Sequence, residues 1–316
     1  MNPHTALPVR YRVLHDTEYA YSQPVTLSQQ RLHLTPREHP WQRVLAHRLG
    51  IDPRPTRWRE DLDPNGNTVV RIDLEQPHER LWVRAESQVE VLPRPPRYPA
   101  ASQPWDALVE DLRYRAGKAY RGSLLEAVRF RFESTHVRVK SDFVDYARHS
   151  FAPGRPLLDG AIDLMGRIHA DFVFDPLATT VATPVTEVLA RRRGVCQDFA
   201  HLMLSCLRSL GLPARYVSGY LLTHPPAGQP RLVGADASHA WVAVFVPGLG
   251  WVDLDPTNDC VVDTEHITVA WGADFADVTP QRGVILGGGA HEVTVRVTVA
   301  PEAEAAALIG PAGARG

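Results

Sequence analysis

Cysteine, charge imbalance and long apolar runs are all scarce in this sequence, and each shortage excludes a class of protein. Three cysteines in 316 residues are too few for the disulfide framework of a small secreted scaffold. The formal net charge is -2 at pH 7, and without a block of basic residues we expect no nucleic-acid partner. No segment reaches roughly 18 consecutive apolar residues, so we expect no membrane span.

The remaining composition is typical of a globular protein in a reducing compartment. Hydrophobic residues make up 44% of the chain and charged residues 22%, as in ordinary folded domains. The N-terminus lacks the charged and then apolar run of a signal peptide. We therefore expect a cytoplasmic protein with free thiols and no membrane partner.

The first third of the chain predicts an antiparallel β domain. Runs rich in β-branched and aromatic residues occur at 68–74 and 81–85, and the sequence DPNGN at 63–67 is a strong turn signal between strands. The proline-rich segment 93–99 ends this pattern because proline cannot donate to a β-ladder. We therefore place an N-terminal β domain at residues 1–95.

The rest of the chain predicts an α+β fold in three parts. A connecting region of helix and loop is expected at 96–154, a core at 155–300 and a flexible, Ala/Pro/Gly-rich tail at 301–316. Apolar residues at helical spacing over 157–172 predict a helix at the start of the core. Valines that alternate with other residues over 293–299 predict a last strand that closes the sheet of the core.

Cys196 is predicted at the N-terminus of a helix. Gly194 precedes it as a stop signal for the previous helix, and Phe199, Met203 and Leu207 follow at steps of three and four. The unpaired N–H groups and the positive end of the helix dipole favour a thiolate at such a position. The backbone N–H of Cys196 is also a candidate donor to an oxyanion.

His239 and Asp255 are predicted to face one another across a hairpin. A turn centred on Pro247 would set them directly opposite, on one face of the sheet. The carboxylate would then accept the Nδ1–H of the ring and hold its orientation. A turn centred one residue earlier would instead pair the histidine with Asp253, and Asn258 is a third and weaker option.

A cysteine, a histidine and an aspartate in this order are the components of a cysteine-nucleophile acyl-transfer site. Each residue alone more often has a structural role, but together they occupy the positions that the chemistry requires. The spacing of cysteine and histidine is not of the zinc-binding type, and His291 and Glu292 lack a second histidine four residues later. We therefore expect no metal and no cofactor.

Four segments resemble the bacterial transglutaminase-like family: RGVCQDFA at 193–200, GLPARYVSGY at 211–220, SHAWV at 238–242 and GWVDLDPTN at 250–258. The resemblance covers roughly residues 155–265, and the β region before it resembles the domain that commonly precedes the core in bacterial members. It implies a papain-like core with a triad of Cys196, His239 and Asp255. In the family the acid is the aspartate before the Pro-Thr-Asn run, which favours Asp255 over Asp253.

The resulting prediction is a transglutaminase-like enzyme that acts on a protein or peptide substrate. Cys196 would attack a glutamine side-chain amide or a peptide amide, and an amine or water would resolve the thioester. The same residues would serve a cysteine protease or peptide amidase, which is the nearest alternative. A binding module that retains the fold without turnover is the third possibility.

Overall fold

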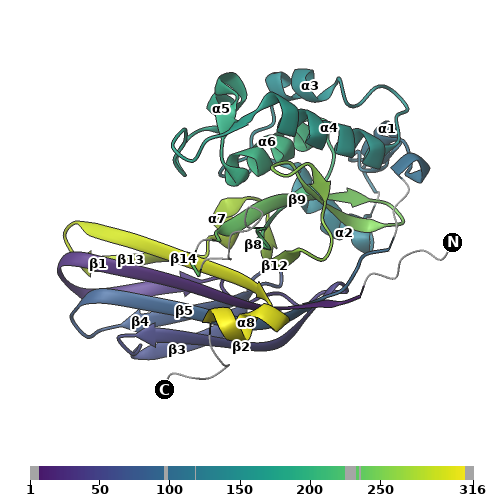
Figure 1. The fold of residues 1–316 in the computed structure, drawn as a ribbon. Coiled ribbons are helices and arrows are strands. Elements are labelled where there is room, and N and C mark those ends of the chain that lie inside the picture. Colours follow the sequence, from purple (N-terminus) through teal and green to yellow (C-terminus); the bar gives the residue numbers. More distant parts are fainter. Residues whose placement is uncertain (1–6, 96–98, 118, 225–232, 235, 310–316) are drawn as a thin grey trace.

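The computed structural model describes residues 7–95, 99–117, 119–224, 233–234 and 236–309. It contains a seven-stranded and a five-stranded antiparallel sheet, and Figure 1 shows the helices of residues 141–209 gathered on the far side of the second sheet from the first. The predicted α+β fold, with an antiparallel β domain before a papain-like core, is confirmed.

The seven-stranded sheet is built around one long strand that pairs along both of its edges. Its order is β2-β5-β1-β4-β3, and β13 and β14 also pair with β1. The strands are β1 (Val9–Leu32), β2 (Gln42–Asp52), β3 (Arg57–Leu62), β4 (Thr68–Leu74), β5 (His78–Val91), β13 (Gln281–Gly287) and β14 (His291–Pro301). Alternate residues of β5 are buried over most of its length, as the period of two in a strand requires for a sheet with one covered face.

The strand predicted to close the core sheet lies in the other sheet. β14 runs antiparallel to β1, with Tyr11 opposite Pro301 and Tyr21 opposite His291. β5 pairs with the same part of β1 on its other edge. The alternation of valines predicts a strand, but it contains no information about the partner strand.

The segment after β14 also differs from the prediction of a flexible tail. Residues Glu302–Ile309 form helix α8, which packs against β1 and β14. Ala305 is fully buried there, and the alanine-rich segment has a high helix propensity. Residues 310–316, the remainder of the expected tail, lie outside the described residues.

The core consists of the second sheet and the helices against it. The sheet order is β11-β10-β9-β8-β12. The strands are β8 (Ala214–Leu221), β9 (Ser238–Val246), β10 (Gly250–Asp255), β11 (Cys260–Val261) and β12 (His266–Gly272). Helix α6 (Cys196–Ser209) packs on β8 and β9, and the short parallel strands β6 (Val173–Phe174) and β7 (Arg193–Gly194) precede it.

Helices from the predicted connecting region also contribute to this core. Leu108, Ala127 and Phe143 are buried in the same apolar cluster as the face of α6. The helical elements are α1 (Trp105–Asp111), α2 (Ser123–Val128), α3 (Ser141–Ala147), α4 (Leu157–Asp171), α5 (Val185–Arg191) and α7 (Phe275–Val278), with 3-10 turns at Pro99–Ala101 and Arg129–Arg131. In the part of the chain that the structure describes, no helix combines the length and the apolar character needed to cross a bilayer.

Side-chain amides join the two sheets. The Gln42 amide donates to the carbonyl of Thr268 and accepts from its N–H, both at 2.8 Å. Asn67 does the same for Trp271, at 2.8 and 3.0 Å. These contacts satisfy backbone groups of β12, which is the last strand in its sheet, and Arg37 stacks on the Trp271 ring at 3.5 Å. The N-terminal sheet therefore covers the edge of the core sheet.

Candidate active site

Cys196 is the first residue of α6, as predicted. The helix start is closed by Asp198, whose Oδ2 accepts hydrogen bonds from the Val195 N–H at 2.9 Å and from the Thr179 hydroxyl at 2.6 Å. A Cβ at Gly194 would lie 2.7 Å from the same oxygen, so this position requires glycine. Asp198 thus stabilises the turn that presents the half-buried thiol.

His239 and Asp255 lie on the same face of the β9–β10 hairpin, but not directly opposite one another. The strands pair with Leu254 opposite Val242, so the turn is centred one residue later than predicted. The residue directly opposite His239 is therefore two positions later in the chain than predicted. Asp255 still points to the same face of the sheet as His239, because side chains alternate with a period of two. The two side chains meet diagonally, with 2.7 Å between the imidazole Nε2 and Oδ2 of Asp255.

The Asp255 carboxylate contacts Nε2 of His239, whereas the sequence predicted a contact with Nδ1. A carboxylate can only accept, so Nε2–H of His239 donates to Asp255, and the expected Nδ1–H contact is wrong. The Cys196 side chain lies close enough to His239 to raise the pKa of the imidazole. With Nε2 taken by Asp255, Nδ1 is the ring nitrogen left to exchange a proton with the thiol. The structure therefore brings the three predicted side chains together.

Charge in this cluster favours a protonated imidazole. Burial alone lowers the pKa of His239, but hydrogen bonds to Asp255 and Cys196 and the charge of Asp255 outweigh it and raise that pKa to about 10. Burial alone would raise the pKa of Asp255, but hydrogen bonds from His239, His266 and Asn258 hold it well below its usual range. An imidazolium beside the sulfur stabilises a thiolate.

This arrangement predicts a pH dependence of stability. The pKa of His239 is raised from 6.5 to about 10 in the folded protein, so its stabilising effect is complete below pH 6.5 and is lost as the pH rises through 10. We expect the loss in unfolding free energy on His239→Gln to be larger at pH 6 than at pH 10, measured by urea denaturation. An equal loss at both pH values would contradict the assigned charge state.

Asp255 has more partners than the sequence indicated. Its Oδ2 also accepts from Asn258 Nδ2 at 2.7 Å and from His266 Nε2 at 3.1 Å, and its Oδ1 accepts from the Thr257 N–H at 2.9 Å. Asn258, considered above as a possible triad member, thus supports the aspartate. His266 was missed because it lies on β12, two strands beyond β9 in the sheet.

Asp253, the competing acid, belongs to a different cluster. Its carboxylate is hydrogen-bonded to the guanidinium of Arg94. Burial would raise the pKa of Asp253, but the charges of Arg94 and Arg215 keep it below the ordinary value. Asp253 is therefore part of a buried ion pair that does not involve His239.

The arrangement of His239, Asp255 and His266 also resembles a metal site. Their potential ligand atoms lie within 4.8 Å of one another, and two imidazoles with one carboxylate form a set that zinc accepts. Both imidazole Nε2 atoms, however, donate hydrogens to the same carboxylate oxygen, and a metal would need those nitrogens as unprotonated ligands. We therefore interpret the cluster as a hydrogen-bond network.

Exposed apolar side chains lie on the segment that precedes the cysteine helix. Val173, Phe174 and Leu177 are 60%, 54% and 93% exposed. Phe174 is paired with Gly194, two residues before Cys196. The same segment is tied to the first turn of α6 by the hydrogen bond from Thr179. An apolar surface therefore lies on the segment that pairs with the chain just before Cys196.

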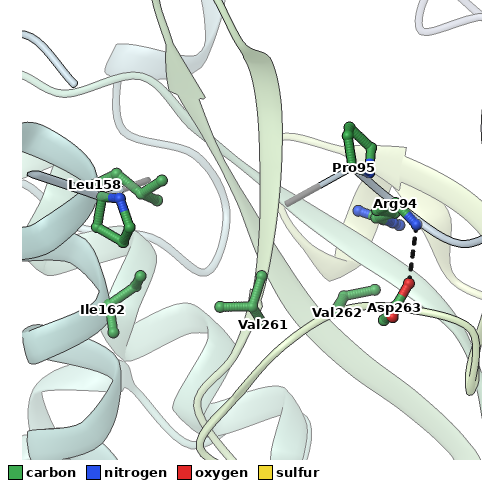
Figure 2. Close-up of a pocket in the computed structure, with 8 residues that line it drawn as sticks. Arg94, Pro95, Leu158, Ile162, Val261, Val262 and Asp263 are labelled. Atoms are coloured by element: carbon green, nitrogen blue, oxygen red, sulfur yellow. Dashed lines mark hydrogen bonds between the residues drawn. The ribbon is translucent and has the colours of Figure 1, made fainter. Parts of the chain in front are cut away.

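A separate pocket of about 280 Å3 opens between α4, β11 and the segment after β5 (Figure 2). Its walls are mainly apolar, and Arg94 and Asp263 lie at one side, joined by a hydrogen bond from the Arg94 N–H. The lining residues are Arg94, Pro95, Pro99, Leu158, Ile162, Val261, Val262 and Asp263. Cys196, His239 and Asp255 are not among them, so we assign this pocket no part in the chemistry.

Two family descriptions match the sequence. Residues 11–90 match the bacterial transglutaminase-like N-terminal region, and residues 145–256 match the transglutaminase-like superfamily. An uncharacterized protein of Mycobacterium tuberculosis is 44% identical over 300 residues, which are 92% of this chain and 93% of the relative. These likenesses cover both sheets of the structure.

Two further likenesses are more limited. A protein-glutamine gamma-glutamyltransferase of Pseudomonas aeruginosa is 37% identical over 94 residues, which are 27% of this chain and 14% of that protein. A crystal structure from Cytophaga hutchinsonii, described as a candidate cysteine protease, superposes with a TM-score of 0.70 at 18% identity, over 94% of this chain and 92% of that one. At this identity the superposition establishes the shared fold alone.

Proposed function

Because this chain belongs to the transglutaminase-like superfamily and carries the bacterial transglutaminase-like N-terminal region, we propose that it is a cysteine acyltransferase with Cys196 as its nucleophile. The observation that carries the proposal is the hydrogen bond between His239 and Asp255, with the Cys196 side chain close enough to His239 to raise the pKa of the imidazole. A nucleophile, a base and an orienting carboxylate in this order are the functional groups of thiol-based acyl transfer.

In the proposed reaction, the Cys196 thiolate attacks the carbonyl carbon of a glutamine side-chain amide. Nδ1–H of His239 donates its proton to the leaving nitrogen, so that ammonia departs and a thioester forms on Sγ. A primary amine then attacks the thioester, its proton passes to Nδ1, and the new amide is released as the thiolate is restored. Asp255 keeps Nε2–H engaged throughout and stabilises the imidazolium.

The backbone around Cys196 supplies part of the electrostatic stabilisation. We assign the Cys196 N–H, at the N-terminus of α6, as one donor to the oxyanion of the tetrahedral intermediate. Donors of this kind are fixed before the reaction and so stabilise the transition state without reorganisation. Asp198 preserves this geometry by closing the preceding turn.

We propose a protein or peptide as the acyl donor, with an apolar side chain near the reactive glutamine. The exposed Val173, Phe174 and Leu177 supply the apolar surface for it. The partial likeness to a protein-glutamine gamma-glutamyltransferase agrees with this substrate class. Burial of these side chains by a bound peptide would favour binding at roughly 25 cal/mol per Å2.

We expect Phe174→Ala to raise KM about three- to tenfold and to leave kcat nearly unchanged, since it removes contact area and no reacting group. Steady-state kinetics with a peptide donor would measure both constants. Leu125→Ala is a matched control, because Leu125 is 53% exposed on α2 and should leave both constants unchanged. A fall in kcat without a change in KM would contradict a binding role for Phe174.

The proposed function can be tested with a fluorescent primary amine and an unfolded, glutamine-containing protein. Covalent incorporation of the label together with ammonia release supports transamidation, and Cys196→Ala serves as the blank. Ammonia release without label would identify an amidase, and new N-termini would identify a protease. If none of these products forms and Cys196 reacts with iodoacetamide no faster than an ordinary thiol, the chain is a binding module.

A further inference from the structure

The Asp255 carboxylate is shared by two histidines from different strands. Its Oδ2 lies 2.7 Å from Nε2 of His239 and 3.1 Å from Nε2 of His266. Because a carboxylate only accepts, both rings donate N–H to the same oxygen. Asn258 donates to that oxygen as well, but it lies three residues from Asp255, whereas His266 approaches from β12.

The position of His266 is built by close packing across the sheet. Its ring meets the Trp241 ring edge to face, at 5.2 Å between centroids. This approach depends on Gly219 in the intervening strand β8, where a Cβ would lie 2.5 Å from the Trp241 ring and 2.1 Å from the carbonyl oxygen of Ile267. His266 is only 5% exposed, so its ring has little freedom to leave Asp255.

One ring nitrogen of His266 contacts Asp255. Its buried Nδ1 has no hydrogen-bond partner among the described residues. Nε2–H is therefore the group through which His266 acts, and it supplies a hydrogen-bond donor to the carboxylate.

Building on the proposed function, we propose that His266 is a positioning residue for acyl transfer. His266 holds the Asp255 carboxylate in place from a second strand. Its hydrogen bond also draws on the negative charge of that carboxylate, so Asp255 holds the proton of His239 less tightly. His239 must release a proton to the leaving nitrogen and take one from the incoming amine. A carboxylate with fewer donors would bind the imidazolium more strongly and slow the first of these transfers.

Two thiols from different elements also lie near this pair. Cys196 approaches His239 from α6, and Cys260 of β11 is paired with Asp255 in the sheet. Burial, followed by the charges of Asp255, Glu265 and Asp259, raises the pKa of Cys260 to about 11. Cys260 is thus neutral around pH 7, and the charge balance depends on Cys196, His239 and Asp255.

The test compares His266→Phe, which keeps a ring but removes the donor, with His266→Gln, which restores an N–H at similar reach. Both are made in a Cys260→Ser background, because Cys206 is fully buried and Cys196 then accounts for the labelling. The alkylation rate of Cys196 by iodoacetamide is measured from pH 4 to 11. We expect His266→Phe to move the high-pH limb, where the imidazolium loses its proton, upward by about one unit, and His266→Gln to restore it.

With an acyl donor, His266→Phe should lower kcat about tenfold and leave KM unchanged. His15→Phe is the matched control, because His15 is also a buried histidine but binds Tyr220 and Thr17; it should leave the alkylation profile in place. If His266→Phe folds poorly, His266→Asn is used, since its shorter amide does not reach Asp255.

The inference is overturned if a folded His266→Phe or His266→Asn variant gives the wild-type pH profile, because a residue that only packs would not move it. Failure of the proposed function is a separate result. If no acyl donor reacts but the alkylation profile shifts as expected, His266 still positions the Cys196–His239–Asp255 series, and only the reaction assigned to that series is wrong.

Discussion

Cys196→Ala will abolish acyl transfer while leaving the protein folded. Loss of a nucleophile that acts together with its base lowers kcat by about 10⁵–10⁶-fold in comparable enzymes. The thiol is only half-buried, so its removal leaves no large cavity and should change the melting temperature by no more than about two degrees. Amine incorporation and ammonia release give the rate, and thermal denaturation gives the stability.

Cys260→Ser is the matched control for this experiment. Cys260 is also a partly exposed thiol, but its raised pKa leaves it a neutral and weakly reactive group. We expect this variant to retain activity and to lose only background labelling. Retention of more than about 1% of the wild-type rate by Cys196→Ala would exclude this residue as the nucleophile.

Asp255→Asn will lower kcat by roughly 10³–10⁴-fold, as when the acid of a comparable triad is replaced by an amide. The thiol should remain available to alkylation, since the substitution leaves the start of α6 unchanged. The raised pKa of His239 depends on Asp255, so burial should then dominate and bring that pKa down. The high-pH limb of the alkylation profile should therefore move to lower pH, opposite to the shift expected for His266→Phe.

Asp253→Asn tests whether the acid that orients His239 is Asp255 or Asp253. Asp253 is bonded to Arg94 in a buried ion pair, and removal of one partner leaves an uncompensated buried charge, which costs about 3–5 kcal/mol. We expect lower stability and a nearly normal kcat in the protein that remains folded. If Asp253→Asn caused the larger loss in kcat, the aspartate would be wrongly assigned.

The three candidate residues could be located from the sequence because each depends on local structure. The apolar stripe after Cys196 defines a helix and its first turn, and a hairpin with a short turn brings His239 near Asp255 on one face. The turn was displaced by one residue, yet the face was preserved by the alternation of side chains. The identity of the contacting ring nitrogen could not be predicted, because it depends on the diagonal approach.

Contacts between distant strands could not be predicted in the same way. His266 reaches Asp255 across β8 and β9, and that approach depends on the missing side chain of Gly219 and on the packing of Trp241. β14 likewise has the expected alternation but pairs with β1, about 280 residues earlier in the chain. Local patterns specify an element and its faces, whereas strand pairing is decided by the packing of the whole molecule.

The amides of Gln42 and Asn67 occupy the outer edge of β12, so the core sheet depends on the N-terminal sheet to cover that edge. If the core were expressed without the N-terminal sheet, β12 would present unpaired backbone groups to other chains, which is a recognised route to aggregation. The same strand begins at His266, so its fraying would also loosen the hold on Asp255. A core transplanted onto a different N-terminal module would thus need two replacement amides, or another way to end its sheet, before it could be isolated as a working unit.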